Sequence, residues 1–224
     1  NGCTLVNSVI HHGFITADNR KMSKSLGNFF TVREAAEVYG YDCIRMFILM
    51  SHYRSPLNYS GEILMQAKAA LERLSTAKDN LDFFCQNGAD GEMTAAEAET
   101  LASLGVYRQK FCDAMDDDFN TADAISAIFE LVREINSAVS PNAHPTKALA
   151  EGCRALYLEL SDVLGIPFTE KKDELTPEQE ALFNARKDAR KAKNWAESDR
   201  IRDELKAQGI LVEDTPQGMK WKRI

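Results

Sequence analysis

The sequence predicts a mainly α-helical protein, with an antiparallel helical bundle in its middle and a small α+β unit at its C-terminus. Between residues 61 and 164, apolar side chains recur at helical spacing, and short polar or Gly- and Pro-containing loops interrupt them. Amphipathic helices joined by short loops are typical of a bundle. After residue 209 the pattern changes to two short β-prone runs around residues 215–218, which is typical of a β-hairpin.

The first sixty residues contain only short elements. Thr31 and Glu34 form a capping box that begins a helix, and Pro56 favours an extended chain. Residues 1–20 have too few strand partners to form a sheet of their own, so we expect the N-terminal part of a larger protein to be missing. The expected elements are a strand over residues 12–16, helices over 31–39 and 42–50, and a linker over 52–60.

Four longer helices are expected to form the bundle. Ser60 can cap the first, a Thr94–Glu97 capping box begins the second, and Thr121 can cap the third. A proline-bounded loop precedes the fourth, whose inward residues include Val163. The expected helices cover residues 60–86, 94–115 and 121–139, and a last one ends near residue 164.

The last segment begins with a charged linker over residues 169–175. Thr176 and Gln179 then form a capping box around Pro177, which suits the first helical position. A second helix begins after Asn194, and the hairpin follows it. We therefore divide the chain into residues 1–60, 61–168 and 169–224.

Charge is distributed unevenly along the 224 residues, whose formal net charge is −7. The middle segment carries a net charge of −10, whereas the first and last segments carry +2 and +1. Local patches decide which partners a surface attracts, so the overall acidity does not exclude nucleic acid at either end.

The cysteines and the hydropathy of the chain indicate in which compartment the protein is expected. The five cysteines, Cys3 among them, are scattered and form no CxxC pair, which argues against a disulfide framework and against a zinc site built within this chain. No apolar run is long enough to cross a bilayer, and no secretory signal begins the sequence. We expect a cytoplasmic protein without a membrane partner.

Residues 21–28, Lys21-Met22-Ser23-Lys24-Ser25-Leu26-Gly27-Asn28, form the most informative stretch, which we call the lysine loop. Lysine ammonium groups suit phosphate oxygens, and serine hydroxyls with exposed backbone N–H groups add neutral donors. The loop therefore predicts a polyphosphate site, with a solvated basic turn as the alternative.

The lysine loop resembles the signature loop of class I aminoacyl-tRNA synthetases. Three further parts of the chain resemble cysteinyl-tRNA synthetases: residues 53–60, the Asp116-Asp117-Asp118-Phe119-Asn120-Thr121 motif, and a C-terminal part. The C-terminal resemblance consists of residues 189–195, residues 213–218 and Trp221. The resemblance implies that the chain begins with the remnant of a Rossmann catalytic core. The zinc ligands and the His-x-Gly-His motif of this family would lie upstream, outside this chain.

The resemblance implies a reaction in two steps. ATP, with Mg²⁺, and L-cysteine form cysteinyl-adenylate, and the cysteinyl group then passes to tRNA(Cys). Lys24 is expected to stabilise the charge that grows on pyrophosphate, with Lys21 second and Ser23 and Ser25 assisting as ATP-binding residues. Without the N-terminal catalytic half, we expect this chain alone to be inactive.

Residues of the C-terminal segment are expected to read the anticodon. Unstacked bases can lie against an aromatic ring while charged side chains bind their edges. For Trp195 a core position between helix and hairpin is the alternative, and for Trp221 packing is favoured. The resemblance implicates Arg190, Trp195, Asp199, Arg202 and Asp214.

Three alternatives stay open at this point. The Asp116–Asp118 triplet suggests a metal site or an acid/base pair, but a solvated or helix-capping role is favoured. The whole protein could instead be a cysteine ligase acting on an amino sugar, or a non-catalytic module that binds tRNA or helical partners. The complete C-terminal segment argues against the amino-sugar ligase.

Overall fold

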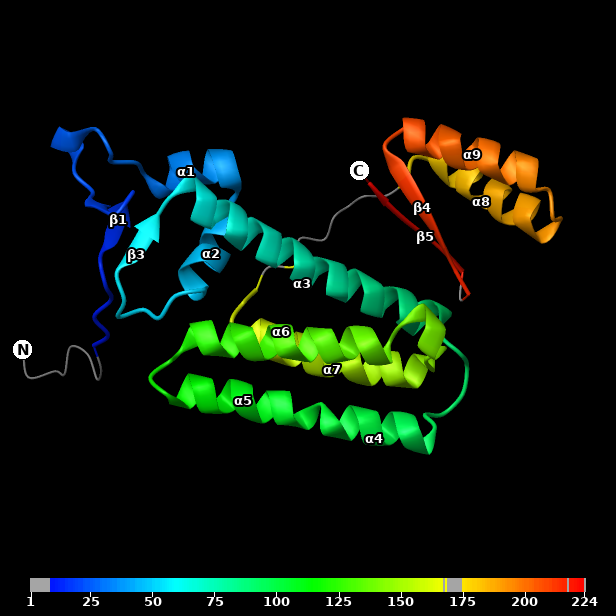
Figure 1. Cartoon of the computed structure of the whole chain (residues 1–224), viewed down its shortest axis with the longest axis horizontal. Coiled ribbons are helices and arrows are strands. Elements are labelled where there is room, and N and C mark those ends of the chain that lie inside the picture. Colours follow the sequence, from blue (N-terminus) through cyan, green and yellow to red (C-terminus); the bar gives the residue numbers. More distant parts are fainter. Residues whose placement is uncertain (1–8, 167, 169–174, 217, 224) are drawn as a thin grey trace, which may run out of the picture.

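The computed structural model describes residues 9–166, 168, 175–216 and 218–223 (Figure 1). The long helix α3 (Gly61–Asn87) connects the N-terminal elements to the rest of the molecule. In the view of Figure 1, the other bundle helices lie on one side of α3 and the C-terminal unit lies on the other. The mainly helical fold with a C-terminal hairpin confirms the predicted fold class.

A three-stranded sheet forms at the N-terminal end, in the order β2-β1-β3. Strand β1 (Ile15–Ala17) pairs antiparallel with β2 (Arg20–Lys21) and parallel with β3 (Leu57–Tyr59). The linker expected over residues 52–60 was wrong in part, because it contains β3, which supplies the partner strand that residues 1–20 lack. Parallel pairing across 42 residues leaves no local signal in the sequence. Helices α1 (Val32–Tyr39) and α2 (Tyr41–Leu49) connect the strands.

The bundle consists of α3, α4 (Ala95–Ser103), α5 (Gly105–Asp116), α6 (Thr121–Ala138) and α7 (Lys147–Val163). The single helix expected over residues 94–115 is divided at Leu104. The Ser103 hydroxyl donates to the Thr100 carbonyl, and Gly105 disfavours helix at the same point. Asn120, rather than Thr121, caps α6.

One core joins α2, α3 and the other bundle helices. Leu74 and Leu81 of α3 pack with Ile128 and Leu131 of α6, and all four are buried. Tyr157 of α7 is also buried, and its hydroxyl donates to the Leu74 carbonyl over 2.8 Å. Val163 is exposed, contrary to the expectation.

The C-terminal unit has its own small core. Helices α8 (Pro177–Lys191) and α9 (Trp195–Ala207) pack against the hairpin of β4 (Ile210–Thr215) and β5 (Gly218–Arg223). Ile201, Leu205, Ile210 and Val212 are buried there, and Trp221 packs against them. Within the described residues, no helix is both long and apolar enough to cross a membrane.

Candidate functional sites

The lysine loop is closed by its own polar groups. The Ser23 N–H donates to Asn28 Oδ1 over 2.9 Å, and Asn28 Nδ2 donates to the Lys21 carbonyl over 3.1 Å. The Leu26 N–H donates to Ser23 Oγ, so Ser23 caps the short helix η1 (Lys24–Leu26). Gly27 closes η1 in the left-handed region, with a φ of 68°, which glycine adopts without strain.

Both lysines of the loop project from this frame into solvent. Lys21 ends β2 and Lys24 begins η1. Among the described residues, neither forms an ion pair with a carboxylate, and Lys24 Nζ lies 5.4 Å from the centroid of the Phe29 ring. The hydroxyls of Ser23 and Ser25 lie 3.2 Å apart beside them. Two exposed cations beside two hydroxyls suit a polyphosphate.

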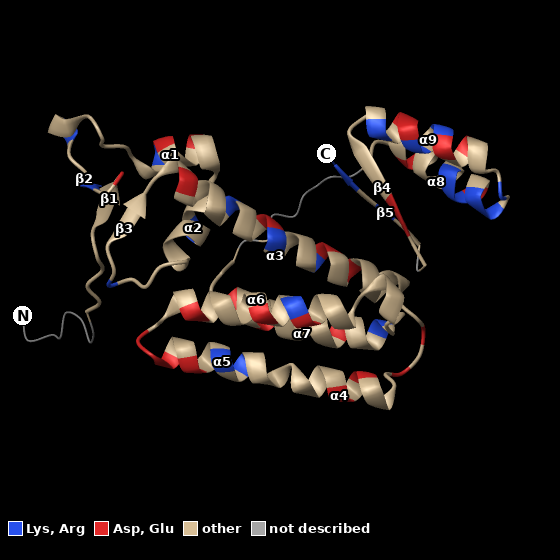
Figure 2. Cartoon of the chain, in the orientation of Figure 1, with Lys and Arg blue, Asp and Glu red and all other residues tan. Residues whose placement is uncertain are grey.

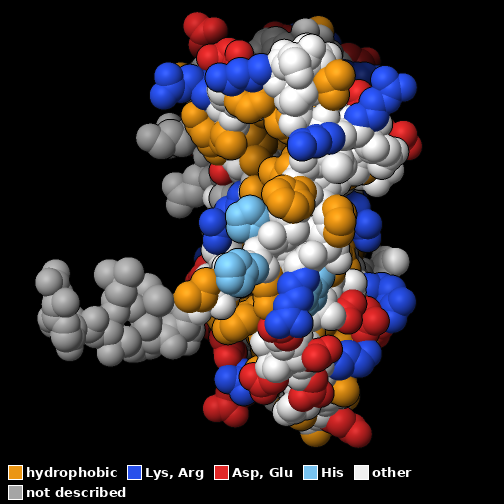
Figure 3. Space-filling view, turned by 90° about the vertical axis from the view of Figure 1, so that its left-hand side faces the viewer, with side chains coloured by type: hydrophobic (Ala, Val, Ile, Leu, Met, Phe, Trp, Pro, Cys, Tyr) orange, Lys and Arg blue, Asp and Glu red, His pale blue; other side chains and the backbone are white. Residues whose placement is uncertain are grey.

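The N-terminal end of the molecule, which carries the lysine loop, exposes many apolar side chains. Hydrophobic and basic side chains are both prominent on this end of the molecule in Figure 3. Phe14 of the strand segment is 85% exposed. Exposed apolar patches in an otherwise well-packed protein mark interaction surfaces. The other large exposed apolar residues here include Val9, Ile10, Leu26, Phe29, Val32 and Val38.

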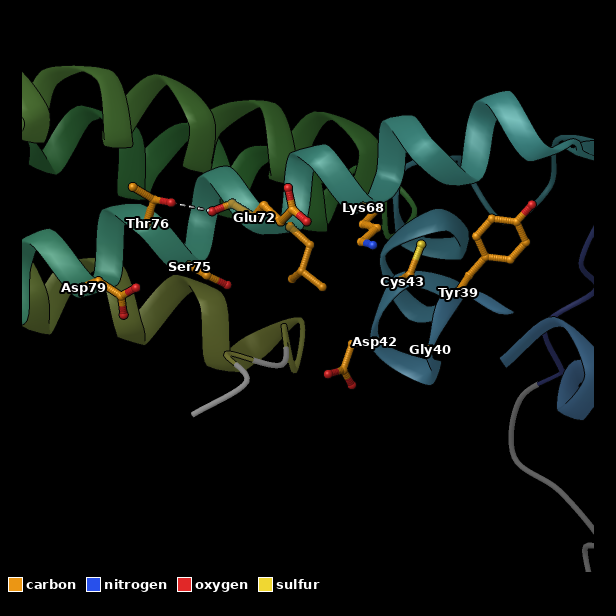
Figure 4. Close-up of a pocket in the computed structure, with 10 residues that line it drawn as sticks. Tyr39, Gly40, Asp42, Cys43, Lys68, Glu72, Ser75, Thr76 and Asp79 are labelled. Carbon is orange, nitrogen blue, oxygen red and sulfur yellow. Dashed lines mark hydrogen bonds between the residues drawn. The ribbon is translucent and has the colours of Figure 1, made fainter. Parts of the chain in front are cut away.

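A separate cavity of about 380 Å³ lies between α2 and α3 (Figure 4). Its charged lining consists of Asp42, Glu72 and Asp79 against Lys68. Carboxylates in this excess repel phosphate, so this cavity does not suit the anion expected at the lysine loop. Within the described ranges, no group of three or more His, Cys, Asp or Glu side chains is arranged to hold a metal ion.

The aspartate triplet does not act as a unit. Asp116 and Asp117 are exposed, whereas the Asp118 carboxylate accepts the Tyr53 hydroxyl over 2.8 Å and pairs with Arg54 over 2.9 Å. The favoured solvated or capping role was therefore wrong for Asp118. The sequence could not show this contact, because its partners lie more than 60 residues away.

A second cluster lies in the C-terminal unit, on α8, α9 and β4. Arg186 is fully buried and donates to both oxygens of Asp214, over 2.7 and 2.8 Å. Arg190, one turn further along α8, donates to the same carboxylate over 3.0 Å. The Arg190 guanidinium also lies 5.6 Å from the centroid of the Trp195 ring. The sequence analysis missed Arg186, although its spacing of four from Arg190 places both on one helix face.

Trp195 is 57% exposed at the start of α9, so its ring is open to a ligand rather than part of the core. Hydrogen bonds from Arg186 hold the pKa of Asp214 below its usual range, although burial opposes this shift. The charges of Arg190 and Arg202 lower it further. Arg202 in turn forms an exposed ion pair with Asp199 over 3.3 Å. The charges of Arg190 and Arg202 both act on Asp214, and Arg190 lies beside the exposed Trp195 ring. Figure 2 shows acidic and basic residues interspersed along α8 and α9.

Comparison with known families supports this division of sites. Residues 1–69 match the family model for tRNA synthetases class I (C) catalytic domain, residues 110–169 the DALR domain, and residues 172–221 the cysteinyl-tRNA ligase anticodon binding domain. In fold, the chain resembles the LeuRS of Agrobacterium radiobacter K84 in its ternary complex with tRNA and LeuAMS. The TM-score is 0.54 at 21% identity, over 67% of this chain and 20% of that one. The matched models thus indicate the class of protein, the class I tRNA synthetases.

Sequence relatives give the family within that class. The chain is 48% identical to the cysteine–tRNA ligase of Symbiobacterium thermophilum over 96% of its length. It is 46% identical to those of Clostridioides difficile and Lachnospira eligens, over 96% and 100% of its length. It spans 45 to 47% of these relatives, about half of each. The chain belongs to the cysteine–tRNA ligase family.

Proposed function

We propose that this chain is the C-terminal half of a cysteine–tRNA ligase, which activates L-cysteine with ATP and transfers it to tRNA(Cys). The observation that carries the proposal is the pair of exposed lysines in the lysine loop, neither in an ion pair with a described carboxylate, in a chain that also matches an anticodon binding domain. That domain match disfavours an amino-sugar ligase, and the match of residues 1–69 to a catalytic domain disfavours a non-catalytic module.

The lysine loop acts on the first step of the reaction. When the cysteine carboxylate attacks the α-phosphate of ATP, the bond to the leaving pyrophosphate breaks and negative charge grows on its oxygens. Lys24 stabilises this charge more in the transition state than in bound ATP, and Lys21 assists it. The hydroxyls of Ser23 and Ser25 donate to the same phosphates. The internal hydrogen bonds of the loop hold these groups in place before ATP arrives.

The C-terminal cluster acts on tRNA recognition. The exposed ring of Trp195 offers a stacking surface for an unpaired anticodon base. The side chains of Arg190, Asp199, Arg202 and Asp214 present donors and acceptors for base edges beside it. The two hydrogen bonds from Arg186 to Asp214 hold the Asp214 side chain in place, so its position does not depend on bound tRNA.

The remaining partners follow from the family. The N-terminal catalytic half packs against the exposed apolar side chains that include Phe14 and Phe29. The chain itself divides into units over residues 1–60, 61–168 and 169–224. ATP binds with Mg²⁺, and a zinc ion is bound in the complete enzyme by residues outside this chain. The complete enzyme works in the cytoplasm, and this chain alone does not activate cysteine.

Replacing Lys24 tests the proposal. In the complete enzyme, Lys24→Ala is expected to slow cysteine-dependent ATP–pyrophosphate exchange about 10²- to 10³-fold, the usual effect of losing one stabilising donor. Lys68→Ala, an exposed lysine of the bundle, is the matched control and should retain the parental rate. Unchanged exchange in Lys24→Ala would remove the lysine loop from the mechanism.

A further inference from the structure

We propose that Asp118 is a positioning residue that fixes the sheet carrying the lysine loop onto the helical bundle. Asp118 lies in the turn between α5 and α6, far along the chain from the loop. Its contacts and backbone geometry carry the inference. Its consequence for catalysis rests on the function proposed above.

The contacts of Asp118 reach the segment that follows α2. Tyr53 donates its hydroxyl to Asp118 Oδ1 over 2.8 Å, and an Arg54 guanidinium nitrogen lies 2.9 Å from Oδ2. His52 Nε2 lies 3.8 Å from the same oxygen. Nearby, the Thr121 hydroxyl donates to the Ser51 carbonyl over 3.5 Å. One carboxylate of the bundle thus gathers three consecutive side chains of residues 52–54.

The same segment is bonded on its other side to the sheet. The Gly13 N–H donates to the Tyr53 carbonyl over 2.7 Å, and the Leu57 N–H donates to the Phe14 carbonyl over 2.9 Å. The fit is close, because a Cβ on Gly13 would lie 2.4 Å from the Ser55 carbonyl oxygen. Residues 13 and 14 lead into β1, which pairs with β2, where the lysine loop begins. A continuous series of bonds therefore joins Asp118 to the loop.

The backbone at Asp118 is held in a costly conformation. Asp118 and Phe119 have φ values of 58° and 55°, in the left-handed region that favours glycine. Two successive non-glycine residues persist there only where their surroundings fix them. This turn directs the Asp118 carboxylate toward residues 52–54, whereas Asp116 and Asp117 stay exposed. The costly backbone of this turn is therefore explained by the contacts of Asp118 with Tyr53 and Arg54.

Amide hydrogen exchange in this chain tests the contact directly. Asp118→Asn removes the charge that Arg54 pairs with and weakens acceptance from Tyr53. Amides of residues 13–21 should then exchange about ten- to a hundredfold faster, as expected when a hydrogen bond to a charged group is lost. Core amides of α6, such as those of Ile128 and Leu131, should keep their protection. Asp117→Asn, with the same charge change one residue away, should alter neither set.

Tyr53→Phe supplies a second variant that leaves the bundle untouched. It should speed exchange of the same strand amides by less than Asp118→Asn does. Combined with Asp118→Asn, it should add little, because both changes remove one contact. Unchanged strand amides in Asp118→Asn, or equal loss of protection in α6, would overturn the proposal.

Kinetics of the complete enzyme separate positioning from general stability. Asp118→Asn should lower kcat of exchange and raise KM for ATP severalfold, with KM for cysteine unchanged, because only the lysine loop is displaced from the phosphates of ATP. An equal rise in the KM values for ATP and for cysteine would count against the positioning role. If Lys24→Ala leaves exchange intact, the proposed function fails, yet the exchange of strand amides still decides whether Asp118 anchors the sheet.

Discussion

Among the described residues, the buried guanidinium of Arg186 forms an ion pair with one carboxylate, that of Asp214, whose side chain is 34% exposed. A buried cation without its partner is strongly destabilising. Because hydrogen bonds from Arg186 place the folded pKa of Asp214 below that of the unfolded chain, the pair contributes stability above about pH 4, the usual aspartate pKa. That contribution is lost as the pH falls through the lower folded value.

Asp214→Asn is therefore expected to destabilise the C-terminal unit by about 2–3 kcal/mol at pH 7, a buried-pair cost reduced for the partial exposure of Asp214. Thermal unfolding followed by NMR amide signals of residues 177–223, between pH 3 and 7, measures this. Below about pH 4 the parent should lose stability as Asp214 is protonated, and the variant, which has no carboxylate there, should lose less. Glu213→Gln, which removes an exposed pair with Lys222, is the control and should behave like the parent. An acid transition unchanged in Asp214→Asn would contradict the assignment.

Trp195 is expected to contribute to RNA affinity and little to folding, because its ring is mostly exposed. Trp195→Ala in the complete enzyme should weaken tRNA(Cys) binding by about 1–3 kcal/mol, the usual worth of one stacked base. Filter binding at fixed salt measures the loss. Trp195→Phe keeps an aromatic face and should retain most of the affinity. Equal affinity of the alanine variant would exclude a stacking role.

Short sequence motifs predicted where the helices begin, but they did not predict which distant segments contact each other. The capping boxes at Thr31, Thr94 and Thr176 all form as predicted, because each uses residues three apart. The sequence offered no such signal for the β1–β3 pairing or for the Asp118 contact, which join distant segments. Of the C-terminal cluster, the family resemblance indicated Arg190 and Asp214, but it did not reveal that Arg186 holds Asp214.

Glu97 shows how one cap can serve two helices. One carboxylate oxygen accepts the Thr94 N–H at the start of α4, and the other accepts the Thr146 N–H at the start of α7, both over 2.8 Å. Burial alone would raise the pKa of Glu97, but these hydrogen bonds outweigh it and lower the pKa. The contacts therefore stabilise the bundle above about pH 4.3, the usual glutamate pKa, and weaken in acid.

Glu97→Gln is expected to destabilise the bundle by about 1–2 kcal/mol, because an amide accepts hydrogen bonds less strongly than a carboxylate and its NH₂ group faces a donor. Urea unfolding followed by circular dichroism at 222 nm measures the change. Glu99→Gln on the exposed side of the same helix is the control. The prediction fails if the two variants unfold at the same urea concentration.

The C-terminal unit meets the bundle where β5 approaches the end of α3. The Lys220 ammonium donates to the Asn80 side chain and lies 4.7 Å from the centroid of the Phe83 ring. Burial lowers the pKa of Lys220. This contact joins the proposed RNA-reading surface to the helix that leads back toward the lysine loop.

Lys220→Met keeps an apolar stem but removes the charge and the donor, so it is expected to loosen the C-terminal unit from α3. Small-angle X-ray scattering should show a larger radius of gyration, while the helix content stays unchanged. Lys222→Met, at an exposed position on the same strand, is the matched control. An unchanged radius of gyration in Lys220→Met would show that other contacts suffice.

Both tryptophans of the chain, Trp195 and Trp221, belong to the C-terminal unit, one with an exposed ring and the other packed on its core. Intrinsic fluorescence excited at the indole band therefore reports on this unit alone, without a label and without a background from the bundle. Quenching by iodide should distinguish the two emitters, since the Trp195 indole is more exposed to the ion than the partly buried Trp221. The molecule carries its own optical probe at the surface where we expect the anticodon.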